Sequence, residues 1–97
     1  MISLENIEKT ISAHKHELQH TFNVKQIGIF GSYVRGEQKK TSDLDILVEF
    51  KKPVGLFHFM DLEEYLAKLT GIQVDLVSKK SLKPRIGARI MKEVVYI

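Results

Sequence analysis

The chain of 97 residues contains no cysteine and no tryptophan, and it has only two prolines. Without cysteine the protein can form neither a disulfide nor a thiolate metal site, so a packed core must provide its stability. No apolar stretch is long enough to cross a membrane, and the N-terminus lacks the pattern of a signal peptide. We therefore expect a cytoplasmic protein rather than a secreted or membrane-spanning one.

The composition is that of an ordinary globular protein, with 43% hydrophobic and 28% charged residues. At this length we expect one domain over residues 1–97, built around a single core. The formal net charge of +3 suits a phosphate-rich ligand or an acidic partner. It is too small to indicate nucleic acid binding by itself.

Short apolar runs alternate along the chain with segments of helical periodicity. We expect strands over about 24–31, 44–50 and 72–77, and helices over about 4–20, 55–69 and from Ser81 or Pro84 onward. The helix over 55–69 is expected to bury six apolar residues: Leu56, Phe59, Met60, Leu62, Leu66 and Leu69. Because helices and strands alternate, the predicted fold class is α+β (mixed α/β), with a small mixed β-sheet covered by helices on one face.

The first predicted strand ends in Gly31 and Ser32, a pair suited to binding an anion. Gly31 allows the backbone to turn sharply and to approach a ligand closely. Ser32 is a good helix N-cap, and the free N–H groups at the start of a short helix would face a phosphate. Arg35 follows closely enough to reach phosphate or an active-site carboxylate. The segment therefore predicts a nucleotide-binding turn.

Asp43 and Asp45 begin the next apolar run, ten residues after the Gly-Ser pair. Side chains alternate along a strand, so both carboxylates are expected on the same face. Two neighbouring carboxylates repel each other unless a cation lies between them, and Mg²⁺ binds a few such oxygens together with phosphate and water. Either half of this pattern also occurs in ordinary turns, but the two at this spacing favour a nucleoside triphosphate bound through metal ions.

Asp75 lies in the third predicted strand, between Val74 and Leu76. If that strand lies beside the one carrying Asp43 and Asp45, three carboxylates converge. Two metal ions about 4 Å apart can then hold the attacking and leaving oxygens of an in-line displacement. Asp75 can also accept the proton of the attacking hydroxyl. On its own it is equally well read as an exposed strand residue.

The Gly-Ser pair, ten intervening residues and Asp-Leu-Asp resemble the signature of the polymerase-beta-like nucleotidyltransferase superfamily. The form Gly-Ser-Tyr-x-Arg-Gly at 31–36 and the pattern of residues 82–96 are similar to the minimal nucleotidyltransferase (MNT) family in particular. The similarity covers nearly the whole chain. It implies a triphosphate site at Gly31 and Ser32, two Mg²⁺ ions at Asp43 and Asp45, and a third acidic ligand at Asp75.

MNT proteins are the antitoxins of pairs whose toxin is a HEPN-domain ribonuclease, and the family transfers AMP from ATP to a tyrosine of that toxin. The resemblance thus implies an Mg-dependent protein adenylyltransferase (AMPylation) that binds a HEPN toxin in a hetero-oligomer. Two alternatives stay open. The chain can be a non-catalytic antitoxin that neutralises its partner by binding alone, or a nucleotidyltransferase that acts on RNA or a small molecule.

A catalytic core would use most of these 97 residues, so we expect the acceptor to bring its own binding surface, as a partner protein does. The C-terminal segment is both apolar and basic and is a candidate docking surface, although core packing explains its apolar residues equally well. Its members are Arg85, Ile86, Arg89, Ile90, Val94, Tyr96 and Ile97.

Overall fold

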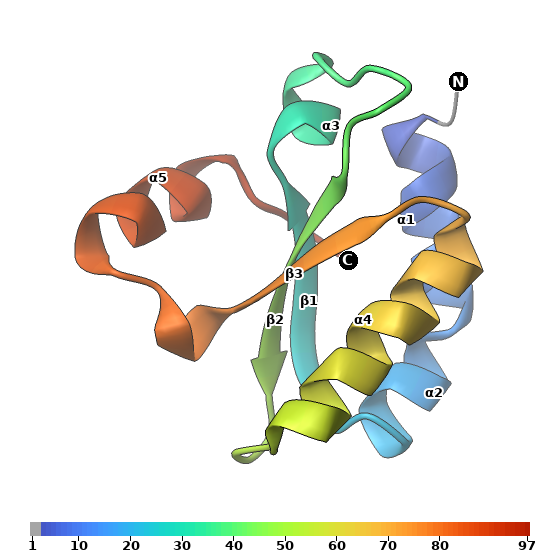
Figure 1. Ribbon diagram of the computed structural model, residues 1–97, viewed down its shortest axis with the longest axis vertical. Helices are drawn as coiled ribbons and strands as arrows, with labels where there is room; N and C mark the ends of the chain where they lie inside the picture. The colour runs from blue at the N-terminus through green and yellow to red at the C-terminus, as the bar shows by residue number, and fades with distance from the viewer. Residues whose placement is uncertain (1–2) are drawn as a thin grey trace.

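The computed structural model describes residues 3–97, which form helices and strands around one four-stranded sheet (Figure 1). In chain order the elements are α1 (Leu4–Ala13), α2 (Lys15–His20), β1 (Val24–Phe30), α3 (Ser32–Arg35), β2 (Leu44–Phe50), α4 (Leu56–Thr70), β3 (Val74–Ser78), the 3₁₀ turn η1 (Lys79–Ser81), α5 (Pro84–Glu93) and β4 (Val95–Tyr96). The strand order is β3-β2-β1-β4. Only β2 and β3 are parallel, whereas β1 is antiparallel to β2 and to β4, so the predicted mixed sheet is confirmed.

The helices α1, α2 and α4 lie on one face of the sheet and build the main core (Figure 1). The alternation of side chains along the strands explains which residues enter it. In β2, Leu44, Ile46 and Val48 face this core, whereas Leu47 faces the other way. The core is completed from the helices by fully buried Ile7, Ile11, Leu18, Leu62 and Leu66.

A smaller apolar cluster lies on the opposite face, where Phe30 and Leu47 meet Ile90 of α5. Ile90 is buried, Val94 packs against the same cluster and Ile97 against the main core. Core packing therefore accounts for these three residues, which belong to no exposed docking surface. The apolar face that α5 leaves exposed is centred on Ile86.

The strand β4 was not predicted, because two residues are too short for any periodic pattern. It pairs with β1 at Gly28, and the backbones come close there. A Cβ on Gly28 would lie 2.7 Å from Val94 Cγ2 and 3.1 Å from the Val95 carbonyl oxygen. The missing side chain of Gly28 thus gives β4 its place at the sheet edge.

The first helix differs from the prediction of one helix over 4–20, since His14 separates α1 from α2. The His14 ring lies 2.9 Å from the Thr10 carbonyl oxygen through Nδ1, and that oxygen is the acceptor that the His14 backbone N–H would use in a continuous helix. The His14 N–H instead bonds to Ile11 O at 3.0 Å. A local side-chain bond therefore interrupts the helix for one residue.

The start of α4 also differs from the prediction. Leu62 and Leu66 are buried as expected, but Leu56 and Met60 are exposed. Residues two apart on a helix point to nearly opposite sides, so Met60 cannot share the face of Leu62. None of the helices formed by residues 3–97 has the length and apolar character that crossing a bilayer requires.

Candidate active site

The turn after β1 brings Gly31 against the start of β2. Phe30 pairs with Asp45, and Gly31 has a φ of +82°, a conformation that L residues rarely adopt. A Cβ on Gly31 would overlap the Asp45 carboxylate and lie 2.9 Å from its Cγ. Gly31 was expected to approach a ligand closely, and in the structure the group that it approaches is the Asp45 carboxylate.

The single helical turn α3 holds Ser32 and Arg35 beside this carboxylate. Gly31, rather than Ser32, has the N-cap position, and its carbonyl accepts from the N–H groups of Val34 and Arg35 at 3.1 and 3.2 Å. The prediction that Ser32 caps the helix is thus wrong by one residue. As the first helical residue, Ser32 is half-buried between Gly31 and Tyr33.

The structure brings Asp43, Asp45 and Asp75 together where β2 and β3 begin. Asp45 is the direct neighbour of Asp75 in the parallel register, and Asp43 immediately precedes β2. Both strands point these aspartates away from α1, α2 and α4, because their neighbours Leu44, Ile46, Val74 and Leu76 face the main core. The pairing of β2 and β3 therefore sets Asp75 beside Asp45, and Asp43 lies close enough for its charge to act on Asp45.

Burial first, and then the charges of nearby Asp75 and Asp43, raise the pKa of Asp45 to about 6, while Arg35 acts against the shift. The carboxylates therefore repel one another in the metal-free protein. A bound cation relieves such repulsion.

The donor set fits Mg²⁺ held together with a nucleotide. Within residues 3–97, no group of three or more His, Asp or Glu side chains is arranged so that it could hold a metal ion. Mg²⁺ is commonly bound by one or two carboxylates, with phosphate oxygens and water completing its octahedron. Asp43, Asp45 and Asp75 offer only such hard oxygen ligands, so the residues present suit an ion that arrives with triphosphate.

Glu93, at the end of α5, is a site residue that the sequence reasoning missed. Its Oε1 accepts from the Gly31 N–H at 2.9 Å, and both of its oxygens lie 3.1 Å from Arg35 Nη1. Partial burial raises the pKa of Glu93, but the Gly31 N–H and Arg35 outweigh it and hold the pKa below its ordinary value. Gly31 and Glu93 are 62 residues apart in the sequence. The spacing of Glu93 from the apolar Ile90 does not indicate this contact.

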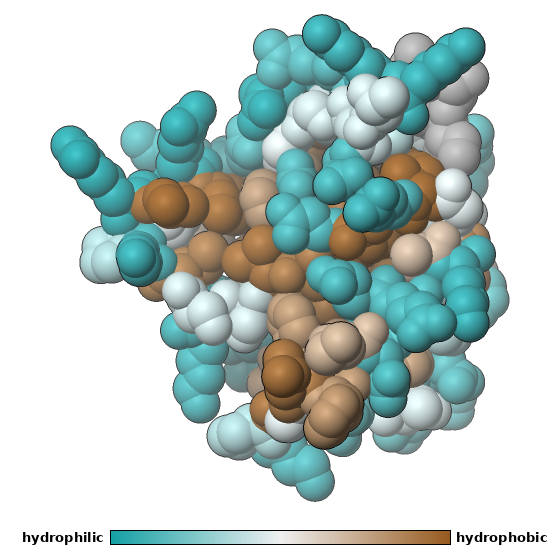
Figure 2. All heavy atoms as spheres, viewed as in Figure 1, coloured by the Kyte–Doolittle hydropathy of each residue, from teal (hydrophilic) through white to brown (hydrophobic). Residues whose placement is uncertain are grey.

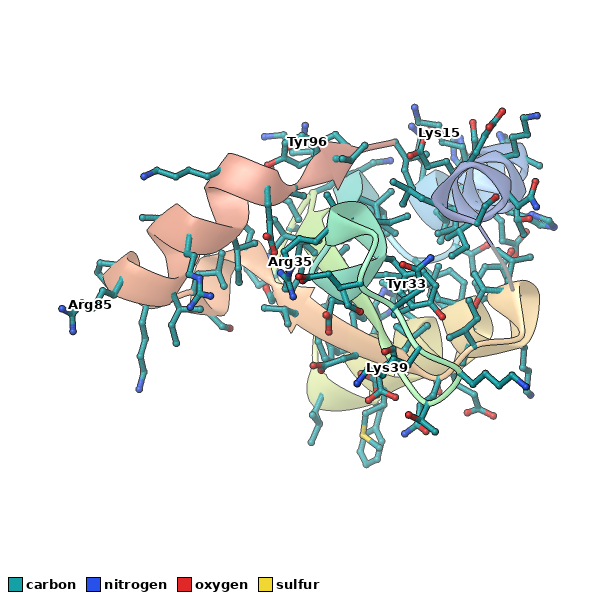
Figure 3. All side chains as sticks on the ribbon, turned by 90° about the horizontal axis from the view of Figure 1, so that it is seen from above. Lys15, Tyr33, Arg35, Lys39, Arg85 and Tyr96 are labelled. Carbon is teal, nitrogen blue, oxygen red and sulfur yellow. The ribbon has the colours of Figure 1, made fainter. Side chains whose placement is uncertain are left out.

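Arg35 is held on its other side by Glu37, whose Oε1 lies 2.6 Å from Arg35 Nε. Hydrogen bonds to Glu37 and then Glu93 raise the pKa of Arg35. Figure 3 shows Arg35 between α3 and α5, whereas Arg85 lies at the far tip of α5 and points away from the body. Of the two arginines, only Arg35 belongs to the site as folded.

The comparisons with known proteins agree with this geometry. A family model described as a nucleotidyltransferase domain matches residues 11–97. The protein adenylyltransferase MntA of Thermococcus cleftensis is 54% identical over 97 residues, which is 100% of this chain and 98% of that protein.

Two solved structures have the same fold. One, assigned as a minimal nucleotidyltransferase, has 32% identity and a TM-score of 0.82 over 97% of this chain and 95% of its own. The other, a toxin–antitoxin with AMP-PNP, has 25% identity and a TM-score of 0.75 over 94% of this chain and 71% of its own. Together with the match over residues 11–97, these similarities establish that the chain belongs to the nucleotidyltransferase domain family, as its resemblance to the minimal nucleotidyltransferases predicted.

Proposed function

We propose that this protein transfers AMP from ATP to a hydroxyl group, that of a tyrosine, on a HEPN-domain toxin, and so acts as its antitoxin. The observation that carries the proposal is the convergence of Asp43, Asp45 and Asp75 beside the Gly31 turn. The name of the relative from Thermococcus cleftensis, protein adenylyltransferase, supports the reaction. The toxin–antitoxin structure with AMP-PNP supports both the nucleotide and the kind of partner.

In the proposed mechanism, Asp43 and Asp45 would hold two Mg²⁺ ions and Asp75 would be the third acidic ligand. When bound, Mg²⁺ neutralises charge on the triphosphate and favours deprotonation of the acceptor. Ser32 and the turn at Gly31 would bind the β- and γ-phosphates, while the Gly31 N–H itself stays bonded to Glu93. Asp75 lies next to Asp45 and is placed to accept the proton of the acceptor hydroxyl. The acceptor oxygen attacks the α-phosphorus in line, the bond to the bridging oxygen breaks, and pyrophosphate leaves.

The Arg35–Glu93 pair supports this arrangement from behind. Glu93 binds the Gly31 N–H and Arg35 together, so it fixes the turn against α5. Because Glu93 holds both the turn and Arg35, Ser32 keeps a fixed position relative to the aspartates. Such preorganisation is what a phosphoryl-transfer site requires.

The test is transfer from ATP labelled at the α-phosphate to the purified HEPN-domain protein from the same genome. We expect Asp43→Asn and Asp45→Asn to lower labelling at least about 100-fold, as when a group that stabilises transition-state charge is lost. Asp61→Asn is the matched control, because Asp61 is an exposed aspartate of α4. Labelling of the partner by Asp45→Asn at the wild-type rate would rule out the proposed chemistry.

The same variants test neutralisation without catalysis. If Asp43→Asn and Asp45→Asn lose labelling yet protect cells from the toxin as well as wild type does, binding alone neutralises the toxin. Protection that disappears with the label, while the complex still forms, supports the enzymatic antitoxin.

A further inference from the structure

The start of α4 exposes three large apolar side chains that the core does not use. Leu56 is 69% exposed, Phe57 81% and Met60 51%. They lie within one and a half turns of the helix, so they form one continuous patch. Figure 2 shows apolar atoms gathered at the lower centre of the molecule, over the start of α4. A patch of this kind on a small protein indicates contact with another molecule.

The patch borders a hollow of about 760 Å³ between the end of β2, the start of α4 and η1. Its apolar lining includes Phe50 and Phe59, together with Leu56 of the patch. Its rim is cationic and is formed by four lysines: Lys51, Lys52, Lys79 and Lys80. We call the hollow together with Leu56, Phe57 and Met60 the α4 groove.

We propose that the α4 groove is a docking site for a segment of the partner protein that presents an apolar side chain flanked by carboxylates. This inference rests on the proposed function, since it names where the protein substrate is held. The apolar lining selects the side chain, and the lysine rim selects acidic neighbours by charge complementarity. Phe57 has the exposure and size of an aromatic anchor, the residue type that dominates binding energy at such sites.

The charge pattern argues against a second copy of this chain as the occupant. A two-fold dimer through the α4 groove would place one lysine rim against the other, and like charges facing each other are costly. The pattern also argues against nucleic acid. Lys79 already lies 3.8 Å from Glu49, and Lys51 Nζ donates to Gln19 O at 2.9 Å. With two of the four lysines engaged, Lys52 and Lys80 remain for a ligand, which suits one or two carboxylates better than the run of phosphates that nucleic acid presents.

The α4 groove and the candidate active site lie at opposite ends of the same strands. Asp45 stands near the beginning of β2 and Phe50 at its end, five residues or about 16 Å further along. A ligand that reaches both must be a macromolecule. Docking at one end then raises the local concentration of the acceptor hydroxyl at the other, without taking part in the chemistry.

The experiment measures affinity and transfer separately, using the HEPN-domain protein from the same genome as the probe. We expect Phe57→Asp to weaken binding about 30-fold, the loss typical of a central anchor, and Lys52→Glu to weaken it in the same direction. The KM for the partner should rise by a similar factor while kcat at saturating partner stays at the wild-type value. Ile86→Asp is the comparison variant, because Ile86 is an apolar residue of α5 with 57% exposure and belongs to the candidate C-terminal docking surface.

Each outcome discriminates between the two proposals. Unchanged binding and KM in Phe57→Asp, beside normal labelling by wild type, would overturn the docking site and leave the proposed function standing. Binding that Phe57→Asp abolishes, with no labelling by wild type, would uphold the docking site and overturn the chemistry. Three other results would overturn the docking site. Partner binding would be lost more in Ile86→Asp than in Phe57→Asp. Alternatively, Phe57→Asp would dissociate a dimer of this chain, or Lys52→Glu would abolish binding of a single-stranded RNA.

Discussion

At the scale of single residues, Asp45 is the most perturbed group of the site. Burial, and then the charges of Asp75 and Asp43, raise its pKa from the ordinary value of 3.8 to about 6. A side chain with this shift, in the middle of an acidic cluster, is typical of a functional position.

The raised pKa predicts how stability depends on pH in the metal-free protein. Between pH 3.8 and about 6 the folded state binds more protons at Asp45 than the unfolded state does, so this contribution to stability is present below pH 3.8 and is lost as pH rises through 6. Asp45→Asn removes the repulsion and should stabilise the protein at pH 7 by roughly 1 kcal/mol, a figure reduced for partial solvation. Urea unfolding from pH 4 to 8 in EDTA measures both effects. A variant that is less stable than wild type at pH 7 would contradict this account.

At the scale of elements, β4 and α5 supply the contacts that hold the Gly31 turn in place. β4 fixes the C-terminal segment against β1, and α5 ends in Glu93, which binds the Gly31 turn. The elements nearest the C-terminus thus stabilise a turn that lies near the middle of the chain.

Gly28 is the position where this arrangement can be tested. A Cβ there would lie 2.7 Å from Val94 Cγ2 and 3.1 Å from the Val95 carbonyl, so Gly28→Ala should displace β4 and cost about 1–3 kcal/mol. Gly55→Ala is the control, because a Cβ on Gly55 meets no atom within 4 Å. Thermal unfolding gives the stability change, and hydrogen exchange at the Ile97 N–H, which bonds to Ile27 O, reports on β4 directly. Equal stability and equal exchange in the two variants would show that β4 tolerates a side chain at Gly28.

At the scale of the whole molecule, our two proposals place acceptor binding and chemistry at opposite ends of β2 and β3. The Asp45 end carries the neighbouring carboxylates of Asp45 and Asp75, and the Phe50 end carries the apolar and cationic α4 groove. A small fold can separate the two functions because an extended strand rises about 3.3 Å per residue, so a few residues of β2 keep the two sites well apart.

Binding of nucleotide and metal should stabilise the molecule as a whole. Any ligand that binds only the folded state raises its stability, by about 2.7 kcal/mol at 100 times Kd, and for a domain of this size 1 kcal/mol shifts Tm by about 4–8 °C. We expect ATP with Mg²⁺ to raise the Tm of wild type by at least about 5 °C, and EDTA to remove that shift. Asp45→Asn should show little shift under the same conditions. An equal shift with ATP in the presence of EDTA would mean that nucleotide binding does not depend on the metal.

The sequence by itself was enough for the elements with strong local patterns. The strand from Leu44 to Phe50 was predicted with the observed bounds, and Gly31, Asp43 and Asp45 were placed on neighbouring elements. These predictions succeed because periodicity, turn residues and motif spacing are properties of a few consecutive residues.

Only the tertiary structure decided the rest, because contacts between distant residues leave no local pattern. It set Asp75 beside Asp45 through the parallel pairing of β2 and β3, and it brought Glu93 to Gly31. It also turned Leu56 and Met60 outward, since a helix can bury only the face that meets the sheet. The residue types fixed the chemistry available to this protein, and the packing of the sheet determined which of them meet.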